Sequence, residues 1–160
     1  STGDMLRAEI AANSELGSQA KKIMDAGELV SDKIMIMMIE NRMFSDKAKL
    51  GVILDGFPRT IKQAEALDEM LTRNNVSIDH VIEIGVDEGA LFDMIAERAS
   101  QSDKVRDDDN AEVLRQRLKV YHDNTAPVLP FYRNKGMLSQ VDGMMSIEEV
   151  AEKISEVLDS

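Results

Sequence analysis

Short runs of apolar residues alternate with longer amphipathic stretches along this chain. Residues 51–55 and 80–86 are two such runs, and Gly, Pro or acidic residues follow each of them. Continuous apolar runs of this length are typical of strands that are buried on both faces of a sheet. Residues 138–141 predict a third strand. Because helical patterns separate these strands, the sequence predicts an α/β fold in which helices sandwich a parallel sheet.

Capping residues predict where several of the helices begin. Ser31 can cap a strongly apolar helix, and Ser146 with Glu149 can cap the last one. Thr60 and Gln63 have the spacing of a capping box, in which each side chain bonds the backbone N–H of the other residue. Helices are expected over residues 5–12, 17–26, 34–43, 60–71, 88–98 and 146–158.

Composition and charge restrict the class of protein. The 160 residues carry 19 Lys and Arg against 30 Asp and Glu, a formal net charge of −11, and 43% of them are apolar. These values fit one folded domain, and the negative charge argues against a general nucleic-acid binder because it repels phosphates. The chain has no cysteine, and His80 and His122 lack the spacing of metal ligands. The sequence therefore excludes a disulfide scaffold and predicts no zinc site.

The turn at residues 55–60, with the sequence Asp-Gly-Phe-Pro-Arg-Thr, is a candidate phosphate site. It follows the first expected strand directly, and ligands of open parallel sheets bind beyond the carboxyl ends of the strands. Asp55 can hold a hydrated Mg²⁺, and Arg59 can point a bidentate guanidinium at a phosphate. The alternative is an ordinary strand-to-helix turn with a solvated arginine. Six residues of these types at this position favour a functional site.

Other arginines and a polar segment could complete such a site. Arg117 lies at the edge of an apolar helical stripe, where its guanidinium either reaches to water or faces an anion in a cleft. Arg7, Arg98 and Arg106 have the same two interpretations, and their number is informative only if they converge on one pocket. Residues 100–110 show no apolar period, which predicts a solvated loop or a lid over a ligand site.

Five stretches of the chain together resemble the adenylate kinases, in the short-lid form of the nucleoside monophosphate kinases. They are STGDMLR at 1–7, MDAGELV at 24–30, DGFPRT at 55–60 with Gln63, RDD at 106–108 with Arg117, and VDG at 141–143. The resemblance implies a P-loop NMP-kinase-like fold and reversible transfer of the γ-phosphate of MgATP to AMP, which gives two ADP. It implies an AMP-binding region at residues 1–30, a core at 31–98 and 110–160, and a short lid at 99–109.

The resemblance also implies roles for individual residues. Gln63 would hydrogen-bond the adenine edge of AMP, and Arg7 and Arg59 would bind its α-phosphate. Asp55 would orient Mg²⁺ through water. The catalytic arginines would be Arg59, Arg98, Arg106 and Arg117, and ATP would contact Arg98 and Met145. The residues that bind substrate would be Thr2, Arg7, Glu28, Leu29, Val30, Gly56, Phe57, Pro58, Arg59, Gln63, Arg106 and Arg117. The partners would be ATP, AMP and ADP, without nucleic acid or membrane, for a cytoplasmic monomer.

The chain departs from the family pattern at two points. Met94 stands where many relatives have an arginine on the ATP side, and no G-x-x-x-x-G-K phosphate loop occurs in the 160 residues. Without that loop we expect the parent protein to be a competent kinase and the 160 residues alone to be inactive. Two alternatives stay open: a kinase for UMP or CMP, whose known members carry Ala at the position of Thr2, and a non-catalytic AMP-binding fragment.

Overall fold

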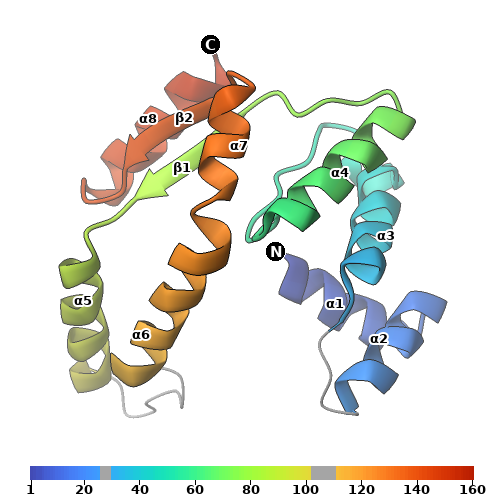
Figure 1. Cartoon of the computed structure of the whole chain (residues 1–160), viewed down its shortest axis with the longest axis horizontal. Helices are drawn as coiled ribbons and strands as arrows, with labels where there is room; N and C mark the ends of the chain where they lie inside the picture. Colours follow the sequence, from blue (N-terminus) through green and yellow to red (C-terminus); the bar gives the residue numbers. More distant parts are fainter. Residues whose placement is uncertain (26–29, 102–110) are drawn as a thin grey trace. The chain divides into compact units, whose positions relative to one another are not determined.

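The structure, a computed structural model, describes residues 1–25, 30–101 and 111–160 (Figure 1). These residues divide into two compact units, Ser1–Ser77 and Ile78–Ser160. The first unit is helical, whereas the second combines helices with a small parallel sheet. The predicted α/β class, with helices and a parallel sheet, is confirmed.

Capping side chains begin two helices of the first unit where the sequence predicts them, whereas the helices predicted over 5–12 and 17–26 begin at Thr2 and Glu15. The Ser31 hydroxyl accepts the N–H of Ile34 at 3.4 Å, and the Thr60 hydroxyl accepts the N–H of Gln63 at 3.1 Å. Each bond satisfies one of the amide donors that the first turn of a helix leaves without a backbone partner. The helices of this unit are α1 (Thr2–Ala11), α2 (Glu15–Asp25), α3 (Asp32–Met43), the short 3-10 helix η1 (Asp46–Ala48) and α4 (Ile61–Arg73).

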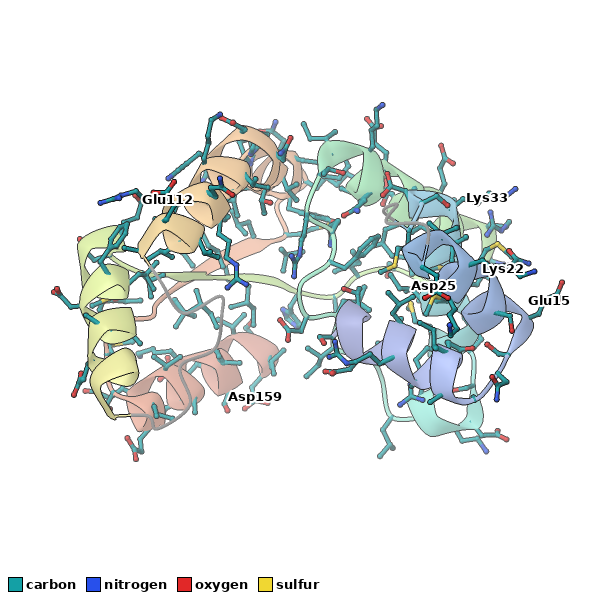
Figure 2. The ribbon with its side chains drawn as sticks, turned by 90° about the horizontal axis from the view of Figure 1, so that it is seen from below. Glu15, Lys22, Asp25, Lys33, Glu112 and Asp159 are labelled. Carbon is teal, nitrogen blue, oxygen red and sulfur yellow. The ribbon has the colours of Figure 1, made fainter. Side chains whose placement is uncertain are left out.

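Glycine at position 17 allows α2 to approach α1 closely. A Cβ atom on Gly17 would lie 2.0 Å from the backbone oxygen of Glu9, so no larger residue fits without a shift of the backbone. The hydroxyl of Ser14 also accepts the Gly17 N–H at 3.0 Å. The charged side chains of Glu15 and Lys22 point away from this helix pair (Figure 2).

The largest fully buried side chains of the described residues lie on α3 and α4. They are Met38 and Ile39 on α3, and Leu67 and Met70 on α4. Full burial of a side chain of this size contributes roughly 1.5–3 kcal/mol. The contact between α3 and α4 is therefore the main apolar core of the first unit.

Side-chain hydrogen bonds at both ends of this core show that α3 and α4 run in the same direction. Near their amino termini, Nε2 of Gln63 donates to Oδ1 of Asp32 at 2.9 Å. Near their carboxyl termini, the side chains of Arg73 and Asn74 donate to the carboxylate of Glu40 at 3.0 and 2.7 Å. The amino termini of both helices consequently lie at one end of the pair.

The sequence prediction of a strand over residues 51–55 is wrong. The segment forms no strand, and Ile53 and the preceding residue Leu50 are 87% and 104% exposed. A strand exists only where a neighbouring strand pairs with its backbone N–H and C=O groups. No strand in the described part of the first unit offers such a partner.

The second unit is built around two parallel strands, β1 (Val81–Gly85) and β2 (Leu138–Asp142). Val81 lies opposite Leu138, and Gly85 opposite Asp142, so both strands end at the same edge. Figure 1 shows α7 and α8 beside this sheet. The helices of this unit are α5 (Glu88–Gln101), α6 (Ala111–Val120), the π-helical turn η2 (Tyr121–Thr125), α7 (Val128–Asn134) and α8 (Ile147–Leu158). The two later predicted strands and the capping box of Ser146 with Glu149 are confirmed.

We expect the bond between Glu40 and the end of α4 to make the stability of the protein sensitive to acid. Hydrogen bonds from Asn74 and Arg73 hold the pKa of the Glu40 carboxyl below its ordinary value of 4.5. The ionised form therefore stabilises the fold above that ordinary value, and the stabilisation is lost as the pH falls through the lowered pKa. Glu40→Gln should lower the midpoint of thermal unfolding at neutral pH. The difference in midpoint between this variant and the unmutated protein should disappear in acid.

Thermal unfolding between about pH 3 and pH 7 measures this difference. Glu65→Gln, at an exposed carboxylate of α4, is the matched control. If the midpoints of Glu40→Gln and of the unmutated protein differ by the same amount across this pH range, the stabilising role of the ionised Glu40 carboxylate is contradicted.

Candidate functional site

The turn before α4 holds the guanidinium of Arg59 in a fixed place. Nε of Arg59 donates to the backbone oxygen of Gly56 at 2.7 Å. Gly56 has a φ of +74°, a conformation that glycine adopts readily and other residues rarely adopt. The Phe57 side chain is buried and Pro58 is half-buried, which anchors the turn to the unit. The sequence prediction of a tight turn that positions Arg59 is consistent with this geometry.

Gln63 joins three parts of the first unit through its side-chain amide. Its Oε1 accepts the backbone N–H of Arg59 at 2.8 Å, and its Nε2 donates to Asp32 at 2.9 Å. The capping box predicted for Thr60 and Gln63 is thus only half right. Thr60 caps the helix, but the Gln63 side chain bonds the residue before Thr60 because the turn brings the Arg59 N–H within its reach.

The amino ends of α3 and α4 form an electropositive region at this end of the unit. Each helix leaves amide donors at its amino terminus, and the aligned peptide dipoles place a partial positive charge there. Since α3 and α4 run in the same direction, these two partial charges lie close together. Such an arrangement favours an anion even in a chain whose net charge is −11.

Two of the predicted site residues, Thr2 and Arg7, lie on α1. Both figures draw the start of α1 beside the turn that precedes α4 (Figures 1 and 2). The exposed guanidinium of Arg7 forms an ion pair with Asp4. Hydrogen bonds from Ser1 and from Arg7 lower the pKa of the Asp4 carboxyl. Arg7 is thus held on the outer surface of α1 by a partner that an incoming anion would have to replace.

Among the predicted residues, Arg98, Arg117 and Met145 belong to the second unit. Arg117 is exposed on α6, Met145 is half-buried before α8, and Met94 is exposed on α5. Arg98 lies on α5, but its side chain is outside the described residues. Glu28, Leu29, Arg106 and most of the predicted lid at 99–109 lie outside the described residues, whereas Val30 lies within them, just before the Ser31 cap.

A hollow of about 400 Å³ lies at the carboxyl ends of β1 and β2. Its lining residues are Glu83, Gly85, Val86, Asp87, Gln140, Val141, Asp142 and Met144. Sequence reasoning named only the stretch 141–143 of this set. The rule that ligands bind at the carboxyl ends of parallel strands could have found the rest.

Three acidic residues, Glu83, Asp87 and Asp142, line this hollow, and their negative charge disfavours a free phosphate there. Gln140 donates to Glu83 at 2.6 Å, and the N–H of Met144 is donated to Asp142 at 2.9 Å. A second hollow, of about 310 Å³, lies among α1, α2 and α3 and contains none of the predicted site residues.

Asp55 lies at the end of the exposed segment and is itself exposed. In the described ranges no three His, Cys, Asp or Glu side chains gather as a metal site would require. Mg²⁺ is commonly held by one or two carboxylates together with substrate phosphates and water. Asp55 fits that mode of binding, in which the metal arrives with the nucleotide.

Across the described helices, none has the length and apolar character needed to span a membrane.

We expect Gly56→Ala to destabilise the protein. An alanine at φ +74° is strained, and its Cβ would lie 2.9 Å from Nη2 of Arg59. Strain of this kind costs about 1–3 kcal/mol of the free energy of unfolding, which denaturant titration measures. Gly136→Ala is the matched control, because Gly136 has a φ of +70° and open space around its Cβ. A larger loss in Gly136→Ala than in Gly56→Ala would contradict the role of the Arg59 contact.

Comparison with known proteins gives a consistent result. The family model described as adenylate kinase matches residues 1–137. The adenylate kinase of Caulobacter sp. (strain K31) is 51% identical over 158 residues, which cover 99% of this chain and 82% of that protein. The adenylate kinase of Parvibaculum lavamentivorans is 50% identical over 159 residues, 99% of this chain and 78% of the relative. That of Azorhizobium caulinodans is 46% identical over 164 residues, 100% of this chain and 84% of the relative.

Proposed function

The chain belongs to the adenylate kinase family, and we propose that its first unit holds the AMP that this family phosphorylates. The function of the adenylate kinase to which this chain belongs is the reversible transfer of the γ-phosphate of MgATP to AMP, which gives two ADP. The observation that carries this function is about 50% identity over nearly the whole chain to relatives named adenylate kinase. A UMP or CMP kinase and a non-catalytic AMP-binding fragment are not favoured.

Gln63 is the residue that reads the adenine base in this proposal. A primary amide carries two N–H donors and two acceptor lone pairs. Asp32 takes one donor and the Arg59 N–H takes one acceptor, so one of each remains. The adenine edge offers one acceptor, N1, and one donor, the 6-amino group. The remaining donor and acceptor of Gln63 match this pair.

Arg59 and Arg7 bind the α-phosphate of AMP in this proposal. The contact with the Gly56 carbonyl positions the Arg59 side chain at Nε. The amino ends of α3 and α4 add to the positive potential at the same end of the unit. Thr2, Val30 and the turn residues 56–58 surround the nucleotide, together with Glu28 and Leu29.

Arg98, Arg106 and Arg117 gather around the phosphoryl group that is transferred, and Met145 contacts ATP. Phosphoryl transfer needs mainly positioning and the neutralisation of charge spread over the transferred group. Guanidinium groups supply both, and closure of the lid at 99–109 over the core at 31–98 and 110–160 excludes water from the reaction. Mg²⁺ enters as part of MgATP, neutralises phosphate charge, and is oriented by Asp55 through water. We further propose a cytoplasmic monomer, on the basis of the family and the acidic charge.

Arg59→Ala tests the phosphate site. Loss of a preorganised donor to a developing charge costs about 2–4 kcal/mol, which corresponds to roughly 30- to 1,000-fold in kcat/KM for AMP. Arg59→Lys should restore only part of the loss, because an ammonium lacks the planar fork of guanidinium. Steady-state ADP formation by the intact enzyme measures the effect.

Arg42→Ala, on the exposed last turn of α3, is the matched control for this experiment. It removes the same charge from the same unit but at the opposite end of the helix pair. A loss below tenfold in Arg59→Ala, or an equal loss in Arg42→Ala, would remove Arg59 from the phosphate site.

A comparison of AMP, UMP and CMP as acceptors tests the choice of substrate. The amide of Gln63 matches the acceptor N1 and the 6-amino donor of adenine. A pyrimidine base is smaller than a purine, so with its ribose and phosphate held in the same place its edge would not reach Gln63. We expect AMP to be phosphorylated with the highest kcat/KM. Faster phosphorylation of UMP or CMP would contradict the assignment of Thr2 and Gln63.

A further inference from the structure

The side-chain amide of Gln63 is held between two groups of opposite hydrogen-bonding character. Asp32 offers a carboxylate, which only accepts, and it takes the N–H of Nε2 at 2.9 Å. The backbone N–H of Arg59 only donates, and it bonds Oε1 at 2.8 Å. Both side chains, Asp32 and Gln63, are half-buried, so water competes only partly for these bonds.

These two partners allow only one orientation of the amide. If the amide turned by 180°, Oε1 would face the carboxylate oxygen of Asp32 and Nε2 would face the N–H of Arg59. Two acceptors would then meet at one end and two donors at the other. Leaving partly buried polar groups unpaired in this way is unfavourable, so the amide stays as it is.

The orientation of the amide determines which purine it can bind. Adenine presents an acceptor at N1 and a donor at its 6-amino group. Hypoxanthine presents the reverse, a donor at N1 and an acceptor at O6. A glutamine that is free to turn can pair with either base, whereas a glutamine with a fixed amide can pair with only one.

We propose that Asp32 is a specificity-determining residue, which makes the site select AMP over 6-oxopurine nucleotides by fixing the orientation of the Gln63 amide. The inference rests on the proposed role of Gln63 in reading adenine. Asp32 acts through Gln63 and is a positioning residue. Discrimination of this kind arises from the penalty that the wrong base incurs as well as from the contacts of the right one.

Binding of AMP and of IMP, measured by calorimetry on the protein, tests the proposal. IMP differs from AMP at the base edge that Gln63 reads and has the same ribose and phosphate. Asp32→Asn keeps the size of the side chain, but its amide can either donate or accept. A turned Gln63 then meets one mismatched partner, the Arg59 N–H, instead of two, so turning costs less. We expect the ratio of AMP affinity to IMP affinity to fall about tenfold or more, the value of one bidentate base contact.

Two further variants separate hydrogen bonding from charge and from stability. Asp32→Glu retains a group that only accepts, and it should restore most of the preference for AMP. Asp46→Asn is the matched control, because Asp46 is an exposed carboxylate in the first turn of η1, and it should leave the ratio unchanged. Thermal unfolding of each variant identifies any that do not fold. If Asp32→Asn does not fold, Asp32→Ser replaces it, since a hydroxyl both donates and accepts.

The outcomes distinguish the inference from the function on which it rests. Suppose that Gln63→Ala weakens AMP binding. If the ratio of AMP affinity to IMP affinity in Asp32→Asn then stays within twofold of the ratio in the unmutated protein, the role of Asp32 is overturned. If Gln63→Ala leaves AMP binding unchanged, Gln63 does not read the base, and the proposed adenine contact is overturned together with the role of Asp32.

Discussion

The buried face that α3 and α4 share determines where the polar residues of the first unit lie. Met38 and Ile39 on one helix and Leu67 and Met70 on the other are fully buried. This packing fixes the two helices in register and in the same direction. Because their first turns then lie side by side, residues that are 31 positions apart in sequence meet at one end. The site therefore depends on an apolar contact that itself touches no ligand.

Features that arise from neighbouring residues could be predicted from the sequence. A hydroxyl at position 31, 60 or 146 needs only the amide groups two or three residues later to cap a helix, so each of these starts was predictable. Strand β1 was predictable because its mainly apolar run is short and bounded, and residues 138–141 also predicted β2. The family resemblance also supplied the function, which depends on the order of motifs along the whole chain.

Features that depend on distant partners could not be predicted in this way. The run at 51–55 has the composition of a strand, but a strand also needs a neighbour, and composition does not reveal one. Gln63 has the spacing of a capping box, yet its amide bonds the Arg59 N–H and Asp32, because the turn and the packing of α3 bring both within reach. Nothing in the sequence near Asp32 indicates a contact with residue 63.

The position of Asp32 raises an electrostatic question, because a carboxylate near a nucleotide site repels phosphate. Two features of the fold reduce this repulsion. Asp32 is the first residue of α3, where the helix dipole stabilises a negative charge, and the amino terminus of α4 lies at the same end. A neutral asparagine would avoid the repulsion, but it could turn together with the glutamine, and only the Arg59 N–H would then oppose a turned amide. A group that only accepts hydrogen bonds must be a carboxylate or a carbonyl, and the parallel helix ends make the charged choice compatible with an anionic substrate.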